Sequence, residues 1–151
     1  MENLFEKEGL EKTINRINQL TPDTTPQWGK MSVDQMLAHV NVAYDMYYNK
    51  DNYPANGFIK KILLKAFVKP PVVGPKPYPK NGRTAPVFII SDKRDFDKEK
   101  ERLVGFLNQT AEHGAHHFEG AESHSFGKMS STEWNVLFAK HIDHHLRQFG
   151  V

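Results

Sequence analysis

The chain contains no cysteine among its 151 residues. This absence excludes thiolate metal ligands, a cysteine nucleophile and a disulfide framework, and it suits a reducing compartment. Any metal ion that the chain binds must therefore be held by histidine and carboxylate side chains. Any thiol that takes part in its chemistry must come from another molecule.

Long apolar runs and a strong charge balance are also missing. No stretch approaches the roughly 20 apolar residues of a transmembrane helix, and the formal net charge is only +2. These absences predict a soluble, cytoplasmic protein with neither a membrane nor a nucleic acid as its partner. One local basic cluster remains, formed by Lys60, Lys61, Lys65 and Lys69. The length fits a single domain that spans residues 1–151.

Four segments carry apolar residues at helical spacing, and they predict an all-α four-helix bundle: residues 3–20, 32–48, 93–112 and 131–148. Capping boxes are expected at three of the helix starts, namely Asn3–Glu6, Ser32–Gln35 and Ser130–Glu133. Ser91 or Asp92 is expected to cap the remaining helix.

The middle of the chain predicts less regular structure. Residues 58–67 form a short amphipathic segment, which we expect to be a packed accessory helix. Six of the nine prolines fall between Lys69 and Pro86, so no regular helix is expected there. This long proline-rich crossover is either a lid over a functional site or an inert connection. Residues 87–90 are expected to be an extended segment that packs on the bundle.

His141 and His145 are the residues that first indicate a candidate metal site. Residues four apart lie one above the other on a helix, so these two imidazoles can share a metal ion. The same spacing occurs in the zinc-binding His-Glu-x-x-His motif, but Ile142 replaces the glutamate that serves there as general base. A hydrolase of that kind is therefore not expected. The alternative for the pair is a polar helix face with hydrogen-bonded histidines.

His39 is expected to lie on the same side of the bundle as this pair. Two helix starts share the pattern aromatic-Gly-Lys-Met-Ser, at Trp28–Ser32 and at Phe126–Ser130. His39 lies seven residues after the first serine and His141 eleven after the second, and a difference of four places both on equivalent helix faces. Alone, His39 fits a hydrogen-bonded core residue. Together, the three histidines fit a catalytic metal site with an open coordination position.

Three neighbours in the last helix are expected to support or surround these ligands: Asp143, His144 and Gln148. A ligating imidazole commonly donates its other N–H to a carboxylate or a carbonyl, which gives such residues their role. Nitrogen ligation suits a divalent metal ion, with zinc and nickel as the first candidates and iron as a further one.

These motifs resemble the DUF1569 branch of the DinB/YfiT-like superfamily of metalloenzymes. The resemblance rests on Trp28–Met31 with Asp34 and His39, on Phe126–Met129, and on the last-helix motif His141–Gln148. It covers both ends of the chain strongly and the middle loosely.

The resemblance implies a DinB-like four-helix bundle whose metal ligands correspond to His39, His141 and His145. In characterised relatives, the open metal position activates a low-molecular-weight thiol for transfer or isomerisation. The implied function is therefore that of a metal-dependent thiol S-transferase or isomerase, with a homodimer as one expected assembly. Two other classes stay open: a non-catalytic, stress-related metal- or ligand-binding bundle, and a structural, dimerising bundle.

The resemblance leaves the loop histidines without a role. The family usually has a His-Pro pair before its Phe-Gly, where this chain has Ser123-His124-Ser125. No ligand role is therefore assigned to His124, nor to His116 and His117. The crossover, with Tyr78 and Arg83, is expected to shape the substrate pocket, because it is the longest irregular stretch available to cover the end of the bundle.

Overall fold

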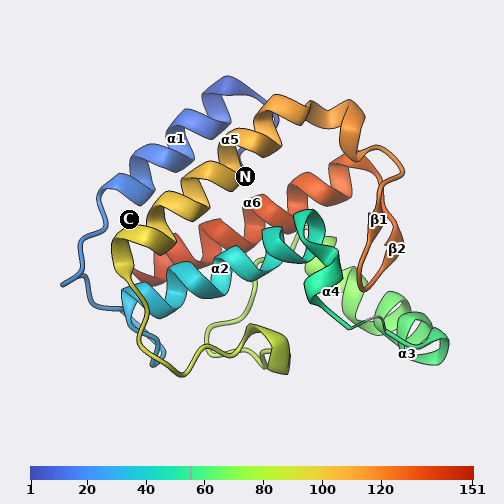
Figure 1. The fold of residues 1–151 in the computed structure, drawn as a ribbon, viewed down its shortest axis with the longest axis horizontal. Coiled ribbons are helices and arrows are strands. Elements are labelled where there is room, and N and C mark those ends of the chain that lie inside the picture. The colour runs from blue at the N-terminus through green and yellow to red at the C-terminus, as the bar shows by residue number, and fades with distance from the viewer. Residues whose placement is uncertain (55) are drawn as a thin grey trace.

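Helices dominate the computed structural model, which describes residues 1–54 and 56–151 (Figure 1). The four long helices pack on one another: α1 (Lys7–Asn18), α2 (Val33–Tyr48), α5 (Phe96–Phe118) and α6 (Ser131–Gln148). Between them lie short helical elements, namely α3 (Phe58–Leu63), a π-helical turn (Leu64–Val68), α4 (Lys69–Val73), and 3₁₀ turns at Lys50–Asn52 and Pro86–Phe88. The predicted helical character is confirmed. A short antiparallel hairpin was not expected; its two strands, β1 (Glu122–Ser123) and β2 (Gly127–Lys128), have two residues each.

Two of the predicted capping boxes form, and they begin the two helices that carry the histidines. Ser32 precedes α2, and its backbone N–H donates to the Gln35 side chain at 3.2 Å. Ser130 precedes α6, where its hydroxyl accepts from the Glu133 N–H at 3.2 Å and its own N–H donates to the Glu133 carboxylate at 3.0 Å. Each box satisfies amide groups that have no partner inside the helix, so local sequence determines where these two helices start.

The predicted cap of α1 is wrong. The Asn3 side chain bonds the Glu6 carboxylate at 2.8 Å, and Glu6, not Asn3, occupies the position before the helix. The N–H of the buried Leu4 donates to the Asn135 side chain of α6 at 2.8 Å. This contact across the molecule holds residues 3–6 against α6 and outside the helix.

The predicted cap of α5 is also wrong. Asp95 accepts from the Lys98 N–H at 3.1 Å and begins the helix, whereas Ser91 and Asp92 lie before it. The helix also continues beyond the predicted end, across a break at Gly114 whose φ of 65° is in the left-handed region. Glycine tolerates that conformation because it has no Cβ, so the helix can bend there and add another turn.

The proline-rich crossover begins with a helix that the sequence did not predict. Residues of α4 are helical through Pro70 and Pro71. The two prolines lie in the first turn of α4, where the N–H group that proline lacks is not needed for a bond inside the helix. The prolines therefore do not end the helix where the composition suggested.

Two expectations about packing in this region are wrong as well. The accessory helix forms, but Phe58 and Phe67 are 80% and 74% exposed and do not pack on the long helices. Residues 87–90 do not form a packed extended segment, because Pro86–Phe88 is a 3₁₀ turn and Ile89 is 61% exposed. Within the described residues, no helix has both the length and the apolar character that crossing a membrane requires.

Aromatic stacking holds α2 against α5 and α6. The Tyr44 ring lies between the rings of Phe106 and Phe138, with centroid distances of 5.7 and 4.4 Å, and all three side chains are buried. Helices α2 and α6 run in opposite directions (Figure 1). His39, which precedes Tyr44, and His141, which follows Phe138, therefore lie on the same side of this stack.

Asp45 generates a prediction about stability. Its carboxylate is nearly buried and accepts hydrogen bonds from Asn49 and Tyr53, each at 2.7 Å, and it forms an ion pair with Arg102 at 2.7 Å. Burial alone would raise the pKa of Asp45, but these partners outweigh burial and leave the pKa below its ordinary value. We expect Asp45→Asn to lower the free energy of unfolding by about 2 kcal/mol at neutral pH, measured by urea unfolding.

The pH dependence of the stability difference between Asp45→Asn and the parent protein tests this prediction. Because the pKa of Asp45 is lower in the folded state than in the unfolded chain, the ionised carboxylate stabilises the fold above about pH 4. The difference between Asp45→Asn and the parent protein should disappear as the pH falls through the folded-state pKa. The exposed Asp51, changed to asparagine, is the matched control and should have little effect at any pH. A difference that persists undiminished in acid would contradict the prediction.

Candidate metal centre

Three imidazoles meet where α2 lies against α6. His39 comes from α2, and His141 and His145 come from successive turns of α6. One ring nitrogen from each lies within 4.8 Å of the other two, and His39 Nε2 is 2.9 Å from His141 Nε2. Across residues 1–54 and 56–151, this cluster includes no carboxylate. The structure thus brings together the three histidines that the helical spacing predicted.

Hydrogen bonds orient two of the three rings. Nδ1 of His39 lies 2.7 Å from the backbone carbonyl of Phe88, and Nδ1 of His145 lies 2.8 Å from Oε1 of Gln148. Both partners are oxygen acceptors, so Nδ1 carries the proton in each ring and Nε2 keeps a free lone pair. The two Nε2 atoms are the nitrogens available to a metal, as in sites where an outer hydrogen bond fixes the tautomer.

The orientation of Gln148 depends on a tight turn before α2. Its Nε2 donates to the carbonyl of Trp28 at 2.7 Å, so its Oε1 faces His145. The next residue, Gly29, has a φ of 84°, and a Cβ added there would lie 2.5 Å from Nε2 of Gln148. Only glycine allows the turn to approach the amide this closely. The Trp28–Gly29 turn therefore acts on His145 through Gln148.

Burial keeps the three imidazoles neutral. It lowers the pKa of His39 despite the hydrogen bond to the Phe88 carbonyl. Burial and the neighbouring histidines lower the pKa of His141 well below its ordinary value, and they lower the pKa of His145 to about 3. Neutral imidazole is the form that binds a metal ion. At neutral pH the cluster therefore presents nitrogen donors and no charge of its own.

This donor set fits a divalent cation. The lone pair on His39 Nε2 points to His141 Nε2 at 2.9 Å, a contact that is favourable only with a proton or a cation between the two nitrogens. Three protein ligands with a further position open are the pattern of a catalytic zinc site, and nickel and iron accept the same nitrogen donors.

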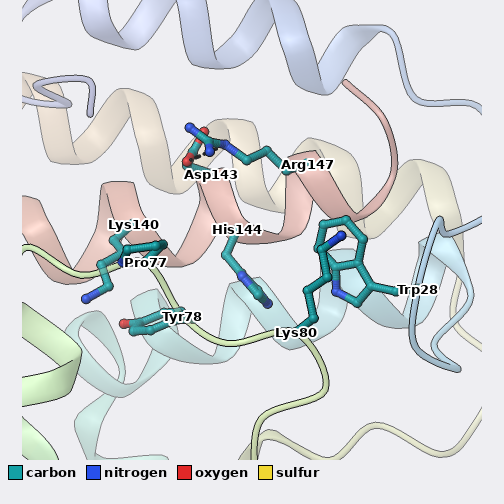
Figure 2. Close-up of a pocket in the computed structure, with 8 residues that line it drawn as sticks. All are labelled: Trp28, Pro77, Tyr78, Lys80, Lys140, Asp143, His144 and Arg147. Atoms are coloured by element: carbon teal, nitrogen blue, oxygen red, sulfur yellow. Dashed lines mark ion pairs between the residues drawn. The ribbon is translucent and has the colours of Figure 1, made fainter.

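A pocket of about 230 Å³ is lined in part by His144, which precedes His145 in α6 (Figure 2). Its lining comes from the turn before α2, the crossover and α6: Trp28, Pro77, Tyr78, Lys80, Lys140, Asp143, His144 and Arg147. His144 links the pocket to the cluster, because its ring lies 5.0 Å from the ring of His145 and 5.7 Å from that of Tyr78.

Asp143 lies in the pocket wall but does not orient a cluster histidine. Its carboxylate pairs with Arg16 of α1 at 2.8 Å and with Arg147 at 2.9 Å. Of the three neighbours expected to support the ligands, only Gln148 forms a hydrogen bond to one of them. Asp143 instead connects α6 to α1.

Lys140 fixes the crossover against α6. It is 4% exposed, and its Nζ donates to the carbonyls of Pro71 and Gly74 at 2.7 and 2.8 Å. The crossover then places Tyr78 in the pocket wall, as expected, whereas Arg83 is not part of the lining. Sequence reasoning missed Lys140, because a lysine beside His141 on a helix has the pattern of an exposed residue.

The histidines that were expected in a loop lie outside the cluster, and two of them, His116 and His117, are in the last turn of α5. The rings of His113 and His117 are 4.2 Å apart at the end of α5, and His124 lies 6.2 Å from the ring of Tyr53. The histidine cluster formed by described residues includes none of them, nor His116. The two carbonyls that orient the ligands, from Trp28 and Phe88, were also missed, because a backbone carbonyl leaves no signal in the sequence.

Comparison with known proteins gives one match. The family described as "Protein of unknown function (DUF1569)" matches residues 3–150. No curated protein and no solved structure matches the chain.

The first prediction from this geometry concerns metal content. We expect His39→Ala, His141→Ala and His145→Ala each to abolish stoichiometric metal binding, because each removes one of three coordinate bonds. Elemental analysis of protein purified without a histidine tag measures this, with circular dichroism to confirm that each variant folds. His116→Ala and His117→Ala are the matched controls and should keep the metal. Loss of metal from the controls alone would show that the ligands are assigned incorrectly.

The second prediction concerns the support of His145. We expect Gly29→Ala to weaken metal binding by about 10- to 100-fold, since it displaces Gln148, and loss of such an outer partner typically has this effect. Gly120→Ala is the control, because Gly120 also has a positive φ, of 74°, but an added Cβ there meets no atom within 4 Å. Both variants share the backbone strain, and only the first disturbs Gln148. Equal metal affinities, measured by competition with a chelator, would contradict the proposed role.

Proposed function

Since the chain belongs to the DUF1569 family, whose description states no function, we propose an activity from its histidine cluster: metal-dependent transfer or isomerisation of a low-molecular-weight thiol. The observation that carries the proposal is the convergence of His39, His141 and His145 within 4.8 Å, beside a pocket. The described residues place three neutral nitrogen donors together, which suits a site whose remaining coordination positions are left to a substrate.

The arrangement of the long helices supports a wider relationship. We propose that the four long helices are a DinB/YfiT-like four-helix bundle. His39 lies on α2, the second long helix, and His141 and His145 lie on α6, the last one. This is the distribution of the three histidines that the motif resemblance implies. The family match covers nearly the whole chain, so the motifs at both ends belong to one family domain.

The absence of cysteine makes an external thiol the natural sulfur source. When bound, a divalent ion supplies a Lewis acid that favours the thiolate form of a small thiol at neutral pH. Helices α2 and α6 supply neutral imidazoles, which do not offset the positive charge of the ion, so that charge remains available to stabilise the thiolate. The pocket beside them, walled by the aromatic rings of Trp28 and Tyr78, is the space for the rest of the substrate.

His144 is suited to accept the proton that the thiol loses. Its ring is half-buried between the cluster and the pocket, and burial lowers the pKa of His144 against the opposite effect of Asp143. The imidazole is therefore neutral at neutral pH and free to take a proton. In the transfer reaction, sulfur forms the new bond to the electrophile, the leaving group departs with the bonding pair, and the thiol proton passes to His144.

Tyr78 contributes structure and not proton transfer. Burial raises the pKa of Tyr78 to about 12, and its hydroxyl donates to the Val72 carbonyl at 3.2 Å. The hydroxyl therefore stays protonated and engaged with the backbone. Its ring, whose centroid lies 6.5 Å from that of His141, forms part of the pocket wall that the crossover supplies.

A rate comparison tests the proposal. We expect metal-loaded protein to accelerate transfer between a small thiol and a reactive electrophile, while chelated protein and His141→Ala do not. His144→Gln should retain the metal and lose roughly 100-fold in rate, the loss expected for a positioned acid–base group. The assay is free of background from protein thiols, because the chain has none. Equal rates in all samples across a panel of thiols and electrophiles would instead favour a metal- or ligand-binding protein without turnover.

A further inference from the structure

An apolar face on α3 and the following π-helical turn is exposed, and none of its residues lines the pocket beside the histidine cluster. Five large side chains form it, and each is between 51% and 80% exposed: Phe58, Ile59, Ile62, Leu63 and Phe67. Their spacing places them along one side of the helix. Figure 1 shows α3 at one end of the molecule, projecting from the four long helices. A contiguous apolar surface of this kind on a protein usually marks an interaction site.

The other side of this segment attaches it to the protein. Leu64 of the π-helical turn and Val72 and Val73 of α4 pack against the core formed by the long helices. Two ion pairs support the attachment, from Lys61 to Glu122 at 3.9 Å and from Lys69 to Glu133 at 2.7 Å. The segment is therefore held in place by one side, and its apolar face is left without a partner among the described residues.

The charges within the segment that carries the apolar face are of one sign. Residues 57–73 include four lysines and no aspartate or glutamate. Lys61 and Lys69 are engaged with the acidic residues of the protein, whereas Lys60 and Lys65 form no ion pair with described residues. An apolar helix face flanked by lysines is typical of a helix that lies in the headgroup region of a membrane.

We propose that the apolar face docks on an anionic lipid surface. Its five side chains enter the boundary between headgroups and acyl chains, and Lys60 and Lys65 contact the lipid phosphates. The segment is too short to span a bilayer, so it lies on the surface. This inference is independent of the proposed thiol chemistry, and it departs from the expectation, based on net charge and hydropathy, that no membrane takes part.

A second copy of the chain fits this face less well. In a symmetric dimer the same face meets itself, which brings the lysines of both copies together. The segment contains no acidic residue that could offset this repulsion. An anionic lipid surface, by contrast, complements both the apolar and the basic part of the face.

Sedimentation with lipid vesicles tests the proposal on the full chain. We expect binding to vesicles that contain phosphatidylglycerol, weaker binding as salt is raised, and little binding to phosphatidylcholine alone. Phe58→Ser combined with Phe67→Ser should abolish binding. Lys60→Gln combined with Lys65→Gln should weaken it roughly 30-fold at low salt, since each lysine near an anionic surface contributes about 1 kcal/mol and 1.4 kcal/mol corresponds to tenfold.

Matched controls lie elsewhere on the surface. Ile89→Ser removes an exposed apolar side chain outside the apolar face, and Lys50→Gln combined with Lys93→Gln removes the same charge from exposed positions outside residues 57–73. These variants should bind as the parent does. The proposal is overturned if the parent protein does not bind either type of vesicle, or if control and apolar-face variants lose binding equally. It is also overturned if analytical ultracentrifugation shows a dimer that Phe58→Ser with Phe67→Ser dissociates, without vesicle binding by the parent.

Discussion

The packing of α2 on α6 through Tyr44 and Phe138 is the interaction on which the candidate site depends. Their rings lie 4.4 Å apart and are nearly parallel, so the two antiparallel helices are held at one register. About one turn from this stack, His39 and His141 point toward each other with their Nε2 atoms 2.9 Å apart. A change of register by one residue would turn one of these imidazoles away, because successive residues on a helix differ by about 100° in direction.

A second layer of contacts then determines which nitrogens face the centre. The Phe88 carbonyl and the Gln148 amide oxygen accept hydrogen bonds from the Nδ1–H groups of His39 and His145, and the Trp28 carbonyl orients Gln148 in turn. These contacts come from a 3₁₀ turn, the last turn of α6 and the loop before α2, which are far apart in the sequence. The rings are therefore oriented before any metal binds, and burial leaves them neutral.

Local patterns in the sequence predicted the parts of the structure that depend on local energies. The boxes at Ser32 and Ser130 involve residues three apart, and the pairing of His141 with His145 follows from helical spacing alone. The failures have two kinds of cause. Asn3 does not cap α1 because its neighbour Leu4 is held by α6, a distant contact, whereas the prolines of α4 are tolerated because they lie in the first turn of that helix. The histidine spacing was sufficient to predict that the three imidazoles come together, whereas the carbonyls and the buried Lys140 required the folded chain.

The two surfaces of interest are attached to the same scaffold at different places. Lys140, next to His141 in α6, holds the beginning of the crossover through the carbonyls of Pro71 and Gly74. The same stretch of chain carries the exposed apolar face before those carbonyls and the pocket residue Tyr78 after them. One anchored segment thus presents an apolar face to the outside and lines the pocket beside the histidine cluster.

The central claim is that three imidazoles hold a metal ion and leave a position open. X-ray absorption at the metal edge, recorded on metal-loaded protein before and after addition of a small thiol, tests it most directly. Three imidazole nitrogens with a light atom in the remaining position are predicted, and sulfur should replace the light atom when the thiol is added. A spectrum with fewer imidazoles, or with carboxylate ligands in their place, would contradict the claim.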